Sequence, residues 1–218
     1  MDITIFKDIK QTARPFYRNI NLILTRIQEG ASKDIVKKIR AEKDKENRNI
    51  LKQKLPAICF SGQFTKRADN AIKEHSGYIC LDFDGYKSNR DLLQEKERLS
   101  KDKFVYSVFI SPSGNGLKVL VKIPPIIDDH KSYFLSLQKY YDSEYFDKTC
   151  KNISRVCYES YDPLIHVNAH SSLWDKIEEQ EYVEVSKHND IPTIPVTDEN
   201  KIIDILIKWW TKKYPMNE

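Results

Sequence analysis

Ile79-Cys80-Leu81-Asp82-Phe83-Asp84-Gly85 is an apolar stretch that ends on two carboxylates. Alternate residues of a β-strand project from the same face, so a strand here places Asp82 and Asp84 on one side and Phe83 on the other. Two neighbouring carboxylates repel each other, and a divalent cation relieves that repulsion; hard oxygen ligands suit Mg²⁺ or Mn²⁺. The stretch therefore predicts a strand that carries a metal site. A pair of surface aspartates before a turn at Gly85 is the alternative interpretation.

A glycine-rich turn joins two further strand patterns at residues 104–110 and 117–123. Its sequence, Ser111-Pro112-Ser113-Gly114-Asn115-Gly116, has the residues of a hairpin turn, and Lys118 follows it. Small residues let backbone N–H groups approach an anion, and the lysine adds a charge for a phosphate. The spacing is not that of a P-loop, and a strand rather than a helix follows. An ordinary hairpin and an anion-binding turn are both consistent with this pattern.

A third stretch, residues 154–163, reads SRVCYESYDP. Asp162 is a third carboxylate at the end of a strand pattern, and the planar guanidinium of Arg155 suits phosphate or carboxylate. Asp-Pro is also a good turn former, so this stretch alone indicates little. Lys66 and Arg67 precede the acidic strand and are candidate phosphate contacts, with solvated loop charges as the alternative.

The rest of the chain alternates strand and helix patterns, which indicates an α+β fold. Pro15 suits the first turn of a helix that ends at Gly30, and Ser32 can cap a second helix. Residues 37–54 carry many charges of both signs and read as a solvated helical arm, with contacts of its Lys and Arg residues to nucleic acid as the alternative. Further helices are expected at residues 89–99 and 128–141, a turn at 61–62, and strands at residues 3–6, 57–60, 78–83, 153–158 and 164–167.

Composition excludes several classes of protein. The 36 Lys and Arg against 32 Asp and Glu give a net charge of +4, which is weak evidence for a polyanionic partner. The many aromatic residues exclude wholesale disorder, and no apolar run approaches the roughly 18 residues of a membrane span. The four cysteines lack the paired spacing of a zinc or disulfide framework, so free thiols are expected. The N-terminus lacks a signal-peptide pattern, so we expect a cytoplasmic protein.

We expect three segments along the chain. Residues 1–185 form one domain whose N-terminal helical arm covers about residues 15–54, and residues 186–200 form a linker. Residues 201–218 begin a C-terminal helical segment with adjacent tryptophans at Trp209 and Trp210. Such a helix has little left to pack against, which favours a chain that is the front part of a longer protein.

The order of the three stretches resembles the archaeo-eukaryotic primase, or primase-polymerase, superfamily. Within it, residues 60–168 resemble the primase-like N-terminal domain of virulence-associated E-type helicases from mobile elements and phages. The resemblance is carried by Phe60-Ser61-Gly62, His75-Ser76-Gly77, Leu81 to Asp84, Ser111 to Lys118, and Ser154 to Pro163. It implies a primase-polymerase catalytic core, with a mainly antiparallel, RRM-like sheet flanked by helices. The implied activity is a DNA primase or polymerase that uses Mg²⁺ or Mn²⁺ to join dNTPs or NTPs on a single-stranded DNA template. The implied partner is a fused or associated helicase domain.

Site roles follow from the same resemblance. Asp82, Asp84 and Asp162 would be the catalytic metal ligands; Ser111, Ser113, Gly114, Asn115, Gly116, Lys118 and Arg155 would bind the nucleotide; Lys66 and Arg67 would contact nucleic acid. One departure matters, because Lys118 stands where the superfamily's second motif usually has histidine, and lysine cannot reproduce an imidazole's neutral hydrogen bond. A non-catalytic nucleotide- or nucleic-acid-binding module is therefore the second hypothesis, and a metal-dependent nuclease is the third. Isolated histidines such as His75, His166 and His170 are expected at structural positions.

Overall fold

The structure, a computed structural model, describes residues 1–177, 203 and 207–208. The chain divides into two compact units, Met1–Glu179 and Gln180–Glu218. The expected linker at residues 186–200 lies outside the described residues. Of the expected C-terminal helical segment, only Ile203, Ile207 and Lys208 are described, and all three are helical.

The first unit is a mixed α+β fold built on antiparallel strands, which confirms the expected class. Its helices are α1 (Ile20–Glu29), α2 (Lys33–Ala41), α3 (Lys45–Lys52), α4 (Asn89–Ser100) and α5 (His130–Tyr141), with a 3-10 turn at Asp69–Ala71. Its strands are β1 (Asp2–Phe6), β2 (Phe16–Asn19), β3 (Ala57–Cys59), β4 (Gly62–Phe64), β5 (Ile72–His75), β6 (Tyr78–Asp84), β7 (Val105–Ile110), β8 (Gly116–Lys122), β9 (Cys157–Tyr158) and β10 (His166–Val167).

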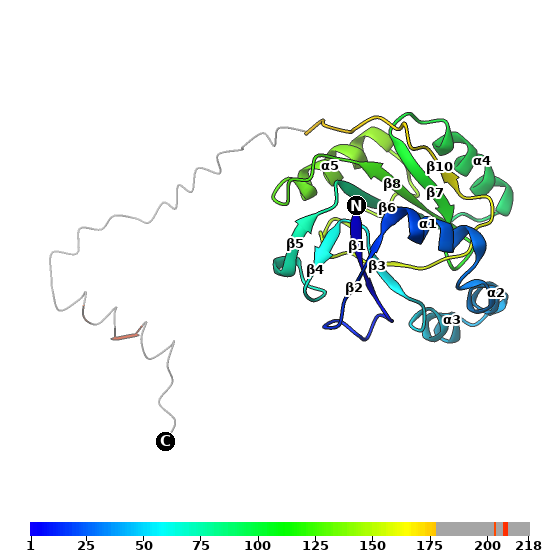
Figure 1. Ribbon diagram of the computed structural model, residues 1–218, viewed down its shortest axis with the longest axis horizontal. Coiled ribbons are helices and arrows are strands. Elements are labelled where there is room, and N and C mark those ends of the chain that lie inside the picture. Colours follow the sequence, from blue (N-terminus) through cyan, green and yellow to red (C-terminus); the bar gives the residue numbers. More distant parts are fainter. Residues whose placement is uncertain (178–202, 204–206, 209–218) are drawn as a thin grey trace, which may run out of the picture. The chain divides into compact units, whose positions relative to one another are not determined.

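Two four-stranded sheets organise the unit, in the orders β10-β7-β8-β6 and β2-β1-β3-β9 (Figure 1). Alternate residues of β6 enter different cores. Ile79, Leu81 and Phe83 pack with α4 and α5, whereas the opposite face of this sheet packs with α1 and β3. Asp82 and Asp84 belong to this second face, which turns toward the other sheet.

The N-terminal region differs from the sequence expectation. The helix expected from Pro15 begins only at Ile20, because residues 16–19 form β2 and pair antiparallel with β1. Asn19 then caps the helix by accepting a hydrogen bond from the Asn21 N–H. A proline tolerated in a helix's first turn is equally compatible with an edge strand, and pairing with β1 decides between them.

Short elements also differ from expectation. The turn expected at residues 61–62 lies at 60–61, since Gly62 already begins β4, which forms a hairpin with β5. The strands expected at residues 153–158 and 164–167 shrink to the two-residue strands β9 and β10.

No helix in the described part of the chain is long and apolar enough to cross a bilayer.

The charged arm forms the helices α2 and α3 and is largely exposed, as expected, while its few apolar residues pack on the domain. Val36, Ile39 and Leu55 form a small apolar cluster against Tyr158 and Tyr161. Ser32 stands at the start of α2, but its hydroxyl donates to the buried Glu159 instead of capping the helix. The arm is thereby fixed to the segment that follows β9.

Candidate functional site

Strand register places Asp82 and Asp84 against β8. Asp82 lies opposite Lys118, and Asp84 lies opposite Gly116. Directly opposed residues of antiparallel strands project from the same face, so the register brings the Lys118 ammonium to the Asp82 carboxylate. The Lys118 Nζ lies 2.5 Å from the Asp82 Oδ2, and both side chains are nearly buried. The two aspartates share a face, as the alternation in the sequence predicts.

Gly116 makes room for the Asp84 carboxylate. A Cβ at this position would overlap the Asp84 Oδ1 and lie 2.8 Å from the carbonyl oxygen of Phe83. The glycine is therefore required by close packing rather than by an unusual backbone angle. Burial raises the pKa of Asp84; the ammonium of Lys118 opposes this shift, and the carboxylate of Asp82 adds to it.

We expect Gly116→Ala to destabilise the domain by about 1–3 kcal/mol, because the new methyl group must displace both the carboxylate and the strand backbone. Urea denaturation of the variant beside Asn115→Ala, a change in the exposed part of the same turn, measures the effect. Equal stability of the two variants would show that the contact is easily relieved.

Two further side chains of the site come from the loop after α5. This loop runs beside the outer edge of β6, where the Asp147 N–H donates to the carbonyl of Asp82. The Cys150 thiol donates to the Asp147 Oδ2 at 2.9 Å and lies 3.4 Å from the Asp82 Oδ2. Ligand atoms of Asp82, Asp147 and Cys150 all lie within 4.8 Å of one another. These three side chains are close enough together to hold a metal ion, and Asp162 is not among them.

Protonation states in this cluster follow from the neighbours. Burial and the nearby Asp82 raise the pKa of Cys150, so its thiol stays protonated and acts as a donor. Burial opposes ionisation of Asp147, but hydrogen bonds from Cys150 and Thr149 outweigh it and lower its pKa. Burial also opposes the charge of Lys118, yet the surrounding acidic groups, Asp82 foremost, raise its pKa. Lys118 is therefore a permanent cation at the site.

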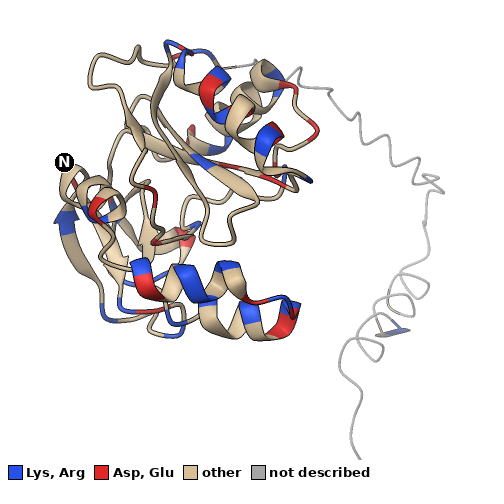
Figure 2. Ribbon diagram, turned by 90° about the vertical axis from the view of Figure 1, so that its right-hand side faces the viewer, with Lys and Arg blue, Asp and Glu red and all other residues tan. Residues whose placement is uncertain are grey.

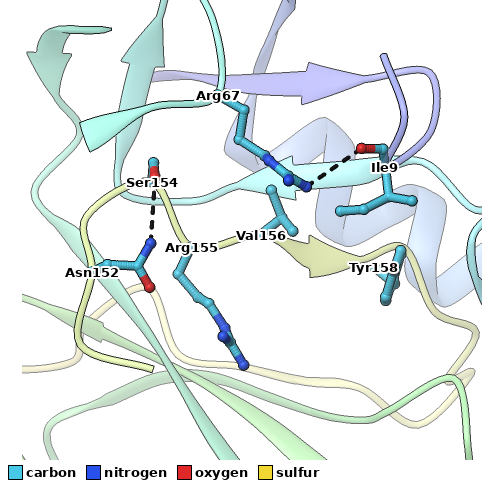
Figure 3. Close-up of a pocket in the computed structure, with 7 residues that line it drawn as sticks. All are labelled: Ile9, Arg67, Asn152, Ser154, Arg155, Val156 and Tyr158. Atoms are coloured by element: carbon cyan, nitrogen blue, oxygen red, sulfur yellow. Dashed lines mark hydrogen bonds between the residues drawn. The ribbon is translucent and has the colours of Figure 1, made fainter. Parts of the chain in front are cut away.

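Arg155 lies between a neighbouring pocket and the group formed by Asp82, Asp147 and Cys150, which together with Asp84 is called the acidic cluster below. Its guanidinium lies 3.6 Å from the Asp147 Oδ2 and 4.0 Å from the Asp82 Oδ2. The same side chain lines a cavity of about 540 Å³. Figure 3 shows Arg155 and Arg67 on different segments of the cavity wall. The wall is completed by Ile9, Asn152, Ser154, Val156 and Tyr158. Cations and apolar surface therefore meet beside the carboxylates.

Asp162, the third expected metal ligand, has a different environment. Its Oδ2 lies 2.6 Å from the Lys96 Nζ and also accepts the N–H of Ile110, while its Oδ1 accepts the N–H of Leu164. The carboxylate is buried, and these three donors satisfy it. Asp162 lies outside the group formed by Asp82, Asp147 and Cys150, and it ties α4 to β7.

Some backbone hydrogen bonds of the glycine-rich turn are formed within the turn itself. The Gly114 N–H donates to the carbonyl of Ser111, and the Ser111 N–H donates to the carbonyl of Gly116. Arg40 of α2 covers the turn and donates to the Ser111 carbonyl at 3.1 Å and to the Tyr161 carbonyl at 2.9 Å. The buried Ser111 hydroxyl has no hydrogen-bond partner among the described residues. The turn thus positions Lys118 and Asp84, while Ser113 and the exposed Asn115 lie at its tip.

Lys66 and Arg67 have different environments in the structure. Lys66 is exposed and does not line the cavity, whereas Arg67 does and donates to the Ile9 carbonyl at 3.4 Å. His75 is buried and hydrogen-bonded, as expected of a structural histidine.

The sequence pattern did not single out Asp147, and for Cys150 it predicted only a buried free thiol. Both lie in an irregular loop without a strand period to mark them. Asp147 has one local signal: Thr149 follows two residues later, and its N–H and hydroxyl both donate to the Asp147 Oδ1. Such an Asx turn is common in loops of any function, so the signal does not specify a site.

Comparison with known proteins gives one family. A family model described as BT4734-like, N-terminal domain, matches residues 50–166, which is more than half of the chain. The matched region contains every residue of the acidic cluster and its two cations. It leaves out β1, β2, α1, α2 and most of α3. No curated protein and no solved structure matches the chain.

Proposed function

The chain belongs to the BT4734-like N-terminal domain family, and we propose that its acidic cluster is the catalytic centre of a primase-polymerase-type nucleotidyltransferase. It would join nucleotides on a single-stranded DNA template, in replication of a mobile element or phage and with a fused or associated helicase domain. The observation that carries the proposal is the convergence of two carboxylates, Asp82 and Asp147, with the cations Lys118 and Arg155 beside a cavity of about 540 Å³. The resemblance to the primase-polymerase superfamily supports the same interpretation.

The donor set fits a hard divalent ion. Asp82 and Asp147 supply carboxylate oxygens within 4.8 Å of each other, and the protonated Cys150 orients Asp147. Asp84, on the same face of β6, would add a third carboxylate. Mg²⁺ or Mn²⁺ bound by these oxygens would lower the pKa of an attacking hydroxyl and neutralise charge on the reacting phosphate. Asp147 thus takes the place that the sequence interpretation gave to Asp162.

Lys118 and Arg155 would bind the triphosphate. The Lys118 ammonium has three N–H donors, of which Asp82 uses one, so it can also contact a phosphate oxygen. The Arg155 guanidinium offers a planar pair of donors between the cluster and the cavity. The apolar wall of Val156 and Tyr158 can hold the nucleoside. Charge on the transferred group would be neutralised by side chains already in position.

The experiment is incorporation of labelled dNTPs and NTPs on single-stranded DNA, with and without a primer, in Mg²⁺ and in Mn²⁺. We expect metal-dependent products from the wild-type chain and their loss in Asp84→Asn, an isosteric change at a strand end. Lys73→Gln, at an exposed position of β5, serves as the control that leaves the carboxylates and the glycine-rich turn intact. Degradation of the template without incorporation would instead identify a metal-dependent nuclease.

One observation favours a second function, a non-catalytic nucleotide-binding module. The 2.5 Å ion pair between Lys118 and Asp82 neutralises a carboxylate that catalysis requires for metal. In that case the wild-type chain binds nucleotide without any product, and the binding does not depend on a divalent ion.

A further inference from the structure

The helical arm α2–α3 is fixed beside the proposed catalytic centre. Arg40 hydrogen-bonds two backbone carbonyls, one in the glycine-rich turn and one at Tyr161. A side chain at Gly114 would contact the Arg40 stem at 3.3 Å, so the arginine lies directly on the turn. Leu51 of α3 packs into the same apolar cluster as α2 and Tyr158. The arm is thus packed on the turn that leads to Lys118, although most of it precedes the matched family region.

Three cations line one face of α3. Lys45, Arg48 and Lys52 stand three and four residues apart, the spacing that aligns side chains along a helix. Glu46 and Leu51 fall on other faces of this helix. Figure 2 shows the Lys and Arg of the arm as blue segments along its helices. From the rise per residue, the stripe from Lys45 to Lys52 is about 10 Å long.

Among the residues that the structure describes, none of these three cations forms an ion pair, whereas Lys96 and Lys118 each pair with an aspartate. An unpaired stripe of one sign on a helix is a surface that attracts a polyanion.

Lys52, at the C-terminal end of the stripe, interacts electrostatically with charged residues of the proposed catalytic centre. Lys52 is half-buried, and burial together with the charges of Arg48 and Lys118 lowers its pKa, against the opposing charge of Asp84. Like charges gathered in a partly buried position repel one another, and a phosphate placed between them would remove the repulsion. Lys45 is exposed and Lys52 is half-buried next to Leu51, which packs against Tyr158, so the stripe runs from the surface toward the body of the domain.

We infer that Lys45, Arg48 and Lys52 of α3 bind the phosphodiester backbone of the nucleic-acid strand whose end enters the acidic cluster. The destination of that strand rests on the proposed function, whereas its binding to α3 can be measured without catalysis. The contacts are to phosphates, so the binding is independent of base sequence.

The test is binding of a fluorescein-labelled single-stranded oligodeoxynucleotide to the full chain, by fluorescence anisotropy, at several salt concentrations and without metal or nucleotide. The variant Lys45→Gln/Arg48→Gln/Lys52→Gln is compared with Lys7→Gln/Lys73→Gln/Arg90→Gln, which removes the same charge from exposed positions elsewhere. Each phosphate contact on a single strand contributes about 0.7 to the slope of log K against log salt, so the α3 variant is expected to lose about 2 from that slope. The affinity should fall roughly tenfold or more at low salt, and the control variant should stay close to wild type.

Equal losses in the two triple variants would overturn the inference, because they would show a general effect of net charge. Absence of oligonucleotide binding by the wild-type chain, or a preference for a lipid vesicle of anionic headgroups over the oligonucleotide, would also overturn it. Circular dichroism of each variant confirms that the fold is retained. A wild-type chain that binds through α3 but incorporates no nucleotide would refute the proposed function and leave the α3 contact in place.

Discussion

Asp82→Asn is expected to reduce nucleotide incorporation roughly 1,000-fold, the scale on which enzymes lose rate when one preorganised charge at the reacting centre is removed. The carboxylate of Asp82 is the point where the cluster converges, since Lys118, Cys150 and Arg155 all approach its Oδ2. The amide of asparagine keeps the shape of the side chain but removes its charge, on which the proposed binding of Mg²⁺ or Mn²⁺ depends.

The same substitution also affects stability, and the two effects must be separated. Removing one partner of a buried ion pair costs about 3–5 kcal/mol, because the remaining charge stays buried without compensation. The double variant Asp82→Asn/Lys118→Met removes both charges and is expected to recover most of that loss. Incorporation should remain absent in the double variant.

Metal binding distinguishes a catalytic from a structural role for Asp82. Titration of free Mn²⁺ by electron paramagnetic resonance should show weaker binding to Asp82→Asn than to wild type. In Lys118→Met the carboxylates have lost a competing cation, so Mn²⁺ binding should be retained or strengthened. If Asp82→Asn binds Mn²⁺ as wild type does, Asp82 serves the fold alone and the metal role assigned to it is wrong.

The strands that carry the site were predictable because their sequence pattern is local. β6 and β8 are mostly apolar segments of seven residues, and the two-residue period of a strand places Asp82 and Asp84 on one face without further information. The register that brings Lys118 to Asp82 follows from the turn between β7 and β8 together with the pairing of β8 with β6. Only the first of these is visible in the sequence.

The remaining site residues depend on contacts between distant segments. Asp147 and Cys150 reach the cluster because an irregular loop runs along the edge of β6, and no sequence period marks such a contact. For Asp162 the sequence is ambiguous. A carboxylate at a strand end looks the same in sequence whether it binds a metal or pairs with Lys96, which lies 66 residues earlier. The distinction requires the position of α4.

A pair of buried histidines gives a second large effect, on stability against pH. His75 accepts the Gly77 N–H at its Nδ1, so its remaining proton is on Nε2, which lies 3.0 Å from the His130 Nδ1. His75 is therefore the donor and His130 the acceptor, and both rings are neutral. Protonating either acceptor nitrogen would break a hydrogen bond in this chain.

Burial lowers the pKa of His75 to about 4 and that of His130 to about 3; repulsion from His75 adds to the shift of His130, and Asp69 opposes it. Both values lie below the ordinary value of 6.5. Below pH 6.5 the unfolded chain therefore binds protons that the folded chain does not. The stability from neutral histidines is complete above that pH and is lost as the pH falls toward the folded-state pKa. The loss is about 2 kcal/mol per histidine between pH 6.5 and 5.

His130→Asn isolates this effect, because the asparagine Oδ1 can accept the His75 N–H in place of the imidazole Nδ1. The free energy of unfolding is measured by urea denaturation from pH 7.5 to 5. Its decrease per pH unit should be smaller in this variant than in wild type, by the amount that about one proton bound on unfolding contributes. His170→Asn, at an exposed position, should retain the wild-type slope. A His130→Asn slope equal to that of wild type would mean that His130 is protonated in the folded chain. The hydrogen bond from His75 would then be incompatible with the geometry, because both facing nitrogens would carry protons.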